Sequence, residues 1–178
     1  YGGGTVWELS PGASGWTYKT LYNFGAPGDA SGPFLSRLAL DAGGNLYGAT
    51  FVGGAKGKGT VYELSPAAGR AWTETVLHRF GFGTDAEFPY AGVTLDAAGN
   101  IYGTAHLGGG GGGQGIVYQL TPALDGTWTE NILHVFSGSD GADPQSTVIL
   151  DSAGNIYGTT VEGGNKFRGV AYKLIPQS

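Results

Sequence analysis

The stretch LDAAGNIYGT, residues 95–104, decides how the rest of this sequence is interpreted. Nearly the same string occurs as LDAGGNLYGA at 40–49 and as LDSAGNIYGT at 150–159. An Asp-x-x-Gly-Asn turn between two apolar segments is typical of a tight β-hairpin. A string that recurs three times is either an active loop in triplicate or the hinge of a repeated structural unit.

The segments around this hairpin repeat with it. Val6, Val61, Val117 and Ala171 stand at matching positions of a V-[WY]-x-L-x-P-like segment, 55, 56 and 54 residues apart. The first three copies are each followed by a strand-like segment that begins at a Trp-Thr pair. A loop with an acid, a proline and small residues then leads to the next LD-x-x-GN string. The period of about 55 residues indicates tandem repeats.

Each repeat contains four strand-like segments, a to d in chain order. In the middle repeat they cover roughly 92–96, 100–106, 115–121 and 128–136. Amphipathic helix periodicity is absent. Four antiparallel strands per repeat predict an all-β fold of β-propeller-like blades. A β-solenoid is the alternative, but its coils usually have shorter periods and no paired hairpins.

The predicted blades are incomplete at both ends of the chain. The single repeat domain, 1–178, holds 13 predicted strands in about three blades. Its parts are a partial blade with strands c and d (1–24), two blades (37–80 and 92–136) and a partial blade with strands a to c (147–178). Unpaired strand edges invite pairing with another chain. We therefore expect either a fragment of a longer propeller or self-association into a closed oligomer or a polymer.

The composition narrows the possible partners and compartments. Glycine accounts for 36 of 178 residues, against a usual ~7%, and its clusters separate Val-, Thr- and Tyr-rich segments. The net charge of −5 and the absence of a Lys/Arg run argue against nucleic acid and anionic membranes as partners. Neither Cys nor Met occurs, which together with few lysines favours an extracellular or cell-surface protein. The start at Tyr1, without a signal peptide, suggests a processed or excised chain.

The combined pattern L-D-x-x-G-N-[LI]-Y-G-[AT], a glycine cluster, [TI]-V-[WY]-[EQ]-L-[ST]-P and W-T-x-x-x-L-x-x-F resembles the Gloeo/Verruco-type tandem repeat. The resemblance covers essentially the whole chain. It implies a propeller-like repeat region of bacterial secreted or surface proteins, and it supplies no catalytic residues. The chain shows no sorting signal of the kind that anchored members carry.

Two series of acidic residues are candidate cation sites. In the hairpin turns, one Asp per copy can donate oxygens to Ca²⁺, but a single acid that accepts N–H bonds of the turn is the favoured interpretation. In the loops after strand d, a weak cation site competes with solvated, turn-forming acids, to which Glu87 and Asp143 add in two copies. No cofactor is expected apart from this possible Ca²⁺. The turn acids are Asp41, Asp96 and Asp151, and the loop acids are Asp29, Asp85 and Asp140.

The three histidines are not expected to be catalytic. His78 and His134 share a repeat position with Tyr22, which favours a role in filling a strand face over that of a general base. His106 stands alone. The sequence has no Cys and none of the motifs G-x-S-x-G or H-E-x-x-H, and a catalytic set needs unique residues that converge on a pocket. We therefore expect no enzyme; a polysaccharide lyase or hydrolase is the least favoured hypothesis.

A series of repeated aromatic residues allows two interpretations. They either pack blade against blade, where each buries about 150–250 Å², or form sugar-stacking pockets as in propeller lectins. Packing is favoured. The series consists of Trp16, Trp72, Trp128, Tyr47, Tyr102 and Tyr157.

The function expected from the sequence is that of a non-enzymatic, extracellular structural or adhesive module. It would bind further copies of itself through its incomplete terminal blades. The alternative is a carbohydrate-binding propeller whose partner is a polysaccharide. No insertion into a membrane is expected, because no apolar stretch approaches ~18 residues.

Overall fold

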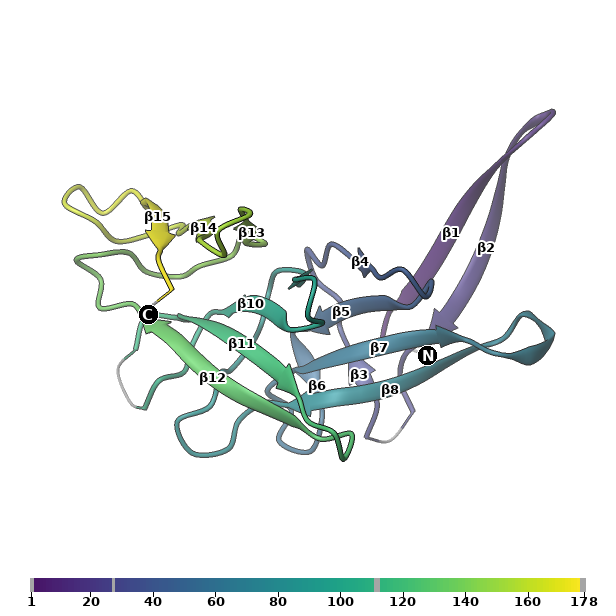
Figure 1. Ribbon diagram of the computed structural model, residues 1–178, viewed down its shortest axis with the longest axis horizontal. Helices are drawn as coiled ribbons and strands as arrows, with labels where there is room; N and C mark the ends of the chain where they lie inside the picture. The colour runs from purple at the N-terminus through teal and green to yellow at the C-terminus, as the bar shows by residue number, and fades with distance from the viewer. Residues whose placement is uncertain (1, 27, 111–112, 177–178) are drawn as a thin grey trace.

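A computed structural model describes residues 2–26, 28–110 and 113–176. Within these residues the chain forms fifteen strands, one 3₁₀ turn (Ala68–Arg70) and no α-helix. The sheets follow one another in chain order, from the projecting hairpin β1–β2 to the sheet that holds β15 (Figure 1). The all-β fold with propeller-like blades, predicted from the repeat, is confirmed.

Two complete blades form the middle of the molecule, each a four-stranded antiparallel sheet in the order a-b-c-d. The second sheet consists of β4 (Ala39–Leu40), β5 (Leu46–Thr50), β7 (Thr60–Pro66) and β8 (Trp72–Arg79). The third sheet consists of β9 (Thr94–Leu95), β10 (Ile101–Ala105), β11 (Ile116–Pro122) and β12 (Trp128–Val135).

Two smaller sheets flank the complete blades. The N-terminal hairpin pairs β1 (Thr5–Gly12) with β2 (Gly15–Asn23), which are strands c and d of the repeat. The C-terminal sheet contains β13 (Ile149–Leu150), β14 (Ile156–Thr159) and β15 (Ala171–Leu174), which are strands a to c. These strands account for the thirteen expected from the sequence.

A short strand pair was not foreseen from the sequence. β3 (Ala30–Ser31) pairs with β6 (Val52–Gly53), so the loop after β2 bonds to the segment after β5 of the next sheet. In the following repeat, Glu87 and Leu107 form an equivalent bridge. The acid-containing loops are therefore tied to the neighbouring blade.

Strand a is shorter than predicted in the second, third and C-terminal sheets, since only two residues pair in each copy. In two of the copies a serine side chain accepts the next N–H of strand b. The N–H of Ala49 donates to Ser36 Oγ at 3.4 Å and that of Thr159 to Ser146 Oγ at 2.9 Å. A serine three residues before strand a thus replaces a backbone acceptor.

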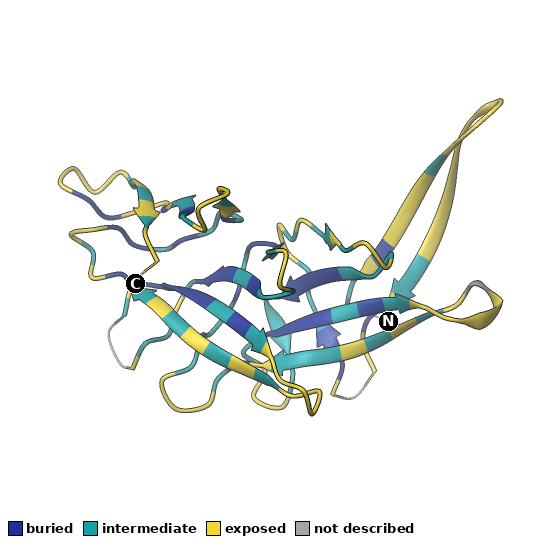
Figure 2. Ribbon diagram, in the orientation of Figure 1, coloured by how far each residue is buried: buried dark blue, intermediate teal, exposed yellow. Residues whose placement is uncertain are grey.

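The hydrophobic cores lie between neighbouring sheets. Val6 and Phe24 of the N-terminal hairpin pack with Tyr62 and Leu64 of β7. Val61, also on β7, belongs to the next core with β11, because successive strand residues point to opposite faces. Each sheet is therefore buried on both faces where it has two neighbours, and Figure 2 shows this burial on the central strands.

In the second, third and C-terminal sheets, the ring of a tyrosine on strand c lies over a glycine on strand b. Gly103 pairs with Tyr118 in the β10–β11 register, and a Cβ at Gly103 would lie 2.5 Å from Tyr118 Cζ. The same relation joins Gly48 to Tyr62 and Gly158 to Tyr172. The glycine of the IYG string is therefore needed for the close approach of an aromatic ring, and it lacks a positive φ.

No helix in the described part of the chain is long and apolar enough to cross a membrane.

Candidate functional site: polar clusters between sheets

The aspartate of each LD-x-x-GN string is bonded into its own turn. Asp41 Oδ1 accepts the N–H groups of Gly43 and Asn45, both at 2.8 Å. Asp41 Oδ2 accepts Asn45 Nδ2 at 2.9 Å and the Tyr47 hydroxyl at 3.2 Å. The same four contacts recur at Asp96 and Asp151, with Ala98 and Ala153 in place of Gly43.

These bonds stabilise the charged form of the turn acids. The backbone N–H of Asn45 is the main cause that holds the pKa of Asp41 below its usual range. At Asp151 the Asn155 side chain is the main cause, and it lowers the pKa to about 2. Both carboxylate oxygens are engaged within the turn, so the geometry favours a turn-forming role over Ca²⁺ ligation.

The positive-φ residue of this turn is the glycine alone. Gly44, Gly99 and Gly154 have φ values of 84°, 85° and 78°. The asparagine that follows has no positive φ and donates to the aspartate through its side chain.

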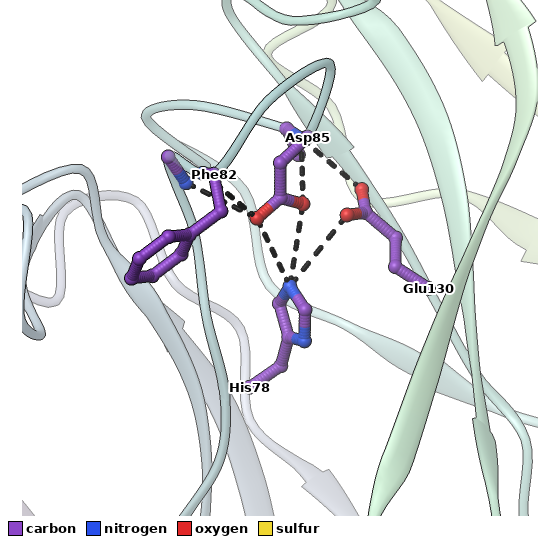
Figure 3. Close-up of polar contacts among 6 residues, drawn as sticks. His78, Phe82, Asp85 and Glu130 are labelled. Carbon is purple, nitrogen blue, oxygen red and sulfur yellow. Dashed lines mark hydrogen bonds and ion pairs between the residues drawn. The ribbon is translucent and has the colours of Figure 1, made fainter.

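The acids of the long loops meet side chains from two different sheets. His78 lies on β8, Asp85 on the loop that follows, and Glu130 on β12 of the next sheet; we call these three the His78 cluster (Figure 3). His78 Nε2 lies 3.3 Å from Asp85 Oδ1 and 3.5 Å from Glu130 Oε2. The side chains are only 18%, 7% and 9% exposed.

Backbone N–H groups orient both carboxylates of the His78 cluster. Asp85 Oδ2 accepts the N–H of Gly81 at 3.2 Å and Oδ1 that of Ala86 at 2.9 Å. The same Ala86 N–H donates to Glu130 Oε1 at 3.2 Å. One loop amide therefore links a carboxylate of its own repeat to a carboxylate of the next.

A homologous arrangement, the Tyr22 cluster, joins the N-terminal hairpin to the second sheet. Tyr22, Asp29 and Glu74 hold the corresponding positions, and the Tyr22 hydroxyl lies 3.5 Å from Asp29 Oδ1 and 3.2 Å from Glu74 Oε2. The Ala30 N–H bonds to both acids, at 3.0 and 3.2 Å. Burial and the Asp29 carboxylate raise the pKa of Tyr22, so its hydroxyl remains a donor.

A third copy has the histidine and the aspartate without a third group among the described residues. His134 Nε2 lies 2.9 Å from Asp140 Oδ2, and this pair is half-exposed. The position of Glu74 and Glu130 belongs to a strand d, and the described C-terminal sheet consists of strands a to c.

Two expectations about these loops need correction. The interpretation as solvated loop acids was wrong for Asp29, which is 8% exposed, because the loop folds against the next sheet. His78 contacts two acids and does more than fill a strand face. Glu74 and Glu130 were not expected at a site, although the W-T-E string at 72–74 and 128–130 marks them as a repeated position.

The clusters recur at matching positions of the sequence repeat. That repeat matches a known family. The sequence model of the Gloeobacter/Verrucomicrobia repeat matches residues 1–178. The chain belongs to this family. Sequence comparison with curated proteins gave no match.

Within the Gloeobacter/Verrucomicrobia repeat of this chain, most of the predicted aromatic series packs inside the molecule. Trp72 and Trp128 are partly buried against cores between sheets, and Tyr47 is buried. Tyr102 and Tyr157 are half-buried, with their hydroxyl groups on Asp96 and Asp151 at 3.0 Å. Trp16, on the N-terminal hairpin, is the exception, since it is 71% exposed.

His106, which has no histidine at the matching positions of the other repeats, also contacts an acidic side chain. Its Nδ1 lies 2.5 Å from Asp143 Oδ1, and its ring packs edge-on to Tyr90. Asp143 adopts φ 54° and also accepts Gln145 Nε2 at 2.7 Å. This pair has two donor groups, whereas the His78 cluster has three within 4.8 Å of one another. The His78 cluster is therefore the best candidate for a functional site.

Proposed function

We propose that this chain is a non-enzymatic structural repeat module, placed outside the cell or on its surface, that binds further copies of itself through its end sheets. One observation carries the proposal. Trp7 and Leu9 of β1 are 52% and 45% exposed, whereas Tyr62 and Leu64, at the same positions of β7, are fully buried. Tyr118 and Leu120 of β11 are fully buried as well.

The exposed face of β1 corresponds to a face that is covered elsewhere by a neighbouring blade. Tyr62 contacts Phe24 of the preceding repeat at 5.0 Å between ring centroids, and Tyr118 contacts Phe80 at 5.1 Å. Trp7 offers the same kind of surface without such a neighbour among the described residues. Neighbouring exposed apolar side chains on one face are typical of an interaction site.

The C-terminal sheet of a second copy is the occupant that fits this face. In that sheet Tyr172 of β15 packs on Phe136 of the preceding blade at 5.1 Å, and β15 pairs with β14 alone. β1 has the same alternation of small and large apolar residues as β15. The exposed face of β1 in one copy can therefore pack face to face on the C-terminal sheet of another, as neighbouring sheets pack within one chain. Repeated head to tail, this contact gives a ring or a filament.

The test is the mass of the chain in solution over a wide concentration range, measured by light scattering. We expect masses at integer multiples of 18.2 kDa that rise with concentration. The double variant Trp7→Glu/Leu9→Lys should remain at one chain. Leu124→Glu is the matched control, because Leu124 is fully exposed on the β11–β12 turn, away from β1. A wild-type chain that stays monomeric at every concentration would contradict the proposal.

Carbohydrate binding is the second candidate, and the clustering of exposed aromatic residues on the N-terminal hairpin favours it. Trp7, Trp16 and Tyr18 are all more than half exposed there, and exposed rings stack on sugars. Tryptophan fluorescence titrated with soluble polysaccharides tests this function. A response that is lost in Trp16→Ser but kept in Trp7→Glu/Leu9→Lys would place the ligand at the hairpin tip and separate binding from self-association.

A further inference from the structure

We infer that the His78 cluster is a binding site for a divalent transition metal ion, with Zn²⁺ as the best match, which ties the second sheet to the third. The site uses one imidazole nitrogen and two carboxylates from β8, from the loop after β8 and from β12. It is separate from the turn acids and from the face of β1 that is proposed for self-association.

The donor spacing is close to that of a metal site. Charge-assisted N–H···O contacts are usually about 2.7–2.9 Å long, as His134 with Asp140 is at 2.9 Å. His78 Nε2 lies 3.3 and 3.4 Å from the two Asp85 oxygens and 3.5 Å from Glu130 Oε2. Bonds of about 2.0–2.2 Å in a tetrahedral zinc site place neighbouring donor atoms about 3.3–3.5 Å apart.

The donor set selects the class of metal. Imidazole nitrogen together with carboxylate oxygen suits Zn²⁺ and similar transition metals. Ca²⁺ and Mg²⁺ prefer six or more oxygen ligands, and the cluster offers a nitrogen and two carboxylates. The two acids also supply the negative charge that a dication needs.

The surroundings hold the donors in place, as the outer contacts of a metal site do. The second oxygens of Asp85 and Glu130 are held by backbone N–H groups of Gly81 and Ala86. The His78 ring packs edge-on against Phe80 at 4.8 Å between centroids. Both acids are at least nine-tenths buried, so the donors are largely shielded from water between two sheets.

The Tyr22 cluster is a control built into the molecule. It has the same two acids and the same shared amide, but a phenol stands in place of the imidazole. With burial raising the pKa of Tyr22, its hydroxyl keeps its proton and remains a poor metal donor. We therefore expect one site per chain, at His78.

Titration of the tag-free chain with Zn²⁺ by calorimetry tests the proposal directly. We expect one ion per chain, with little response to Ca²⁺ or Mg²⁺. His78→Tyr should abolish this binding while it reproduces the natural Tyr22 arrangement, and Glu130→Gln should weaken binding at least 10-fold. His134→Tyr should leave the site intact, because it removes a two-donor pair elsewhere.

The gain-of-function variant sharpens the test. Tyr22→His should raise the stoichiometry from one ion to two, since it completes a second three-donor set with Asp29 and Glu74. At Zn²⁺ about 100-fold above the dissociation constant, the wild-type Tm should rise by about 5–10 °C relative to EDTA. Circular dichroism in EDTA checks that each variant is folded.

Three results would overturn the proposal. They are a wild-type chain without saturable binding at micromolar Zn²⁺, unchanged binding in folded His78→Tyr, and a stoichiometry that stays at one in folded Tyr22→His.

Discussion

Strands β1 and β7 carry nearly the same sequence, TVWELSP at 5–11 and TVYELSP at 60–66, but bury it differently. In β7 the valine, tyrosine and leucine are all fully buried, whereas in β1 only the valine is buried. β7 has a strand on each side and a sheet on each face, while β1 pairs with β2 alone. The comparison shows that neighbouring strands and sheets decide whether the same sequence is buried in a core or exposed on the surface.

The largest expected effect compares one leucine in the two settings. Leu120→Ala, in the buried core, should lower the free energy of unfolding by about 2–5 kcal/mol. Leu9→Ala, at the matching position of the hairpin, should cost less than about 1 kcal/mol, because nearly half of the side chain is already exposed. Urea denaturation at low protein concentration measures both. Equal costs would mean that the hairpin face is covered in solution.

The next effect tests the tyrosine that lies over a glycine. Gly103→Ala places a methyl group against the ring of Tyr118 and should cost about 1–3 kcal/mol through overpacking. Trp7→Leu on the hairpin should cost less than about 1 kcal/mol, since no strand b lies beside β1. A double-mutant cycle with Tyr118→Leu should recover part of the Gly103→Ala cost. Strict additivity would contradict the steric explanation.

The turn acids predict an effect of pH on the stability of the fold. The pKa of Asp151 is about 2 in the folded chain and 3.8 ordinarily, so its contribution to stability is fully present above pH 4. It is lost as the pH falls from about 4 toward 2, when the carboxylate takes up a proton. Asp151→Asn should therefore be less stable than wild type at pH 7, and the difference should shrink at pH 2.5. A difference that persists unchanged at low pH would exclude the charged carboxylate as its cause.

The smallest effect concerns the hydroxyl groups of the buried tyrosines. Among the described residues, Tyr118 Oη has no hydrogen-bond partner, so Tyr118→Phe should change the free energy of unfolding by less than about 1 kcal/mol, toward greater stability. Tyr102→Phe is the matched comparison, because its hydroxyl bonds to Asp96 and Gln119 at 3.0 and 2.8 Å. It should cost about 1 kcal/mol. A larger loss for Tyr118→Phe would show that its hydroxyl is bonded.

The local parts of the structure could be predicted from the sequence because their contacts are close in the chain. The turn from Asp96 to Asn100, the order of strands and the complete blades all depend on neighbours within one repeat.

The candidate site could not be predicted because its members are far apart in the chain. Glu130 reaches His78 across 52 residues, and this requires the third sheet to pack against the second with a definite offset. The sequence marked Asp85 and His78 as separate features of one repeat. Only the packing of two sheets shows that the acid of one repeat completes the pair of the preceding one.

The sequence by itself determined the repeat, its four strands, the hairpin turns tied by Asp41, Asp96 and Asp151, and the glycine that follows each tyrosine. These are consequences of local backbone geometry and of side-chain size. The tertiary structure alone decided that Trp7 lies exposed where Tyr62 is buried, and that His78 and Tyr22 face two carboxylates each. Burial and clustering of charge depend on which sheets become neighbours, and a single repeat does not contain that information.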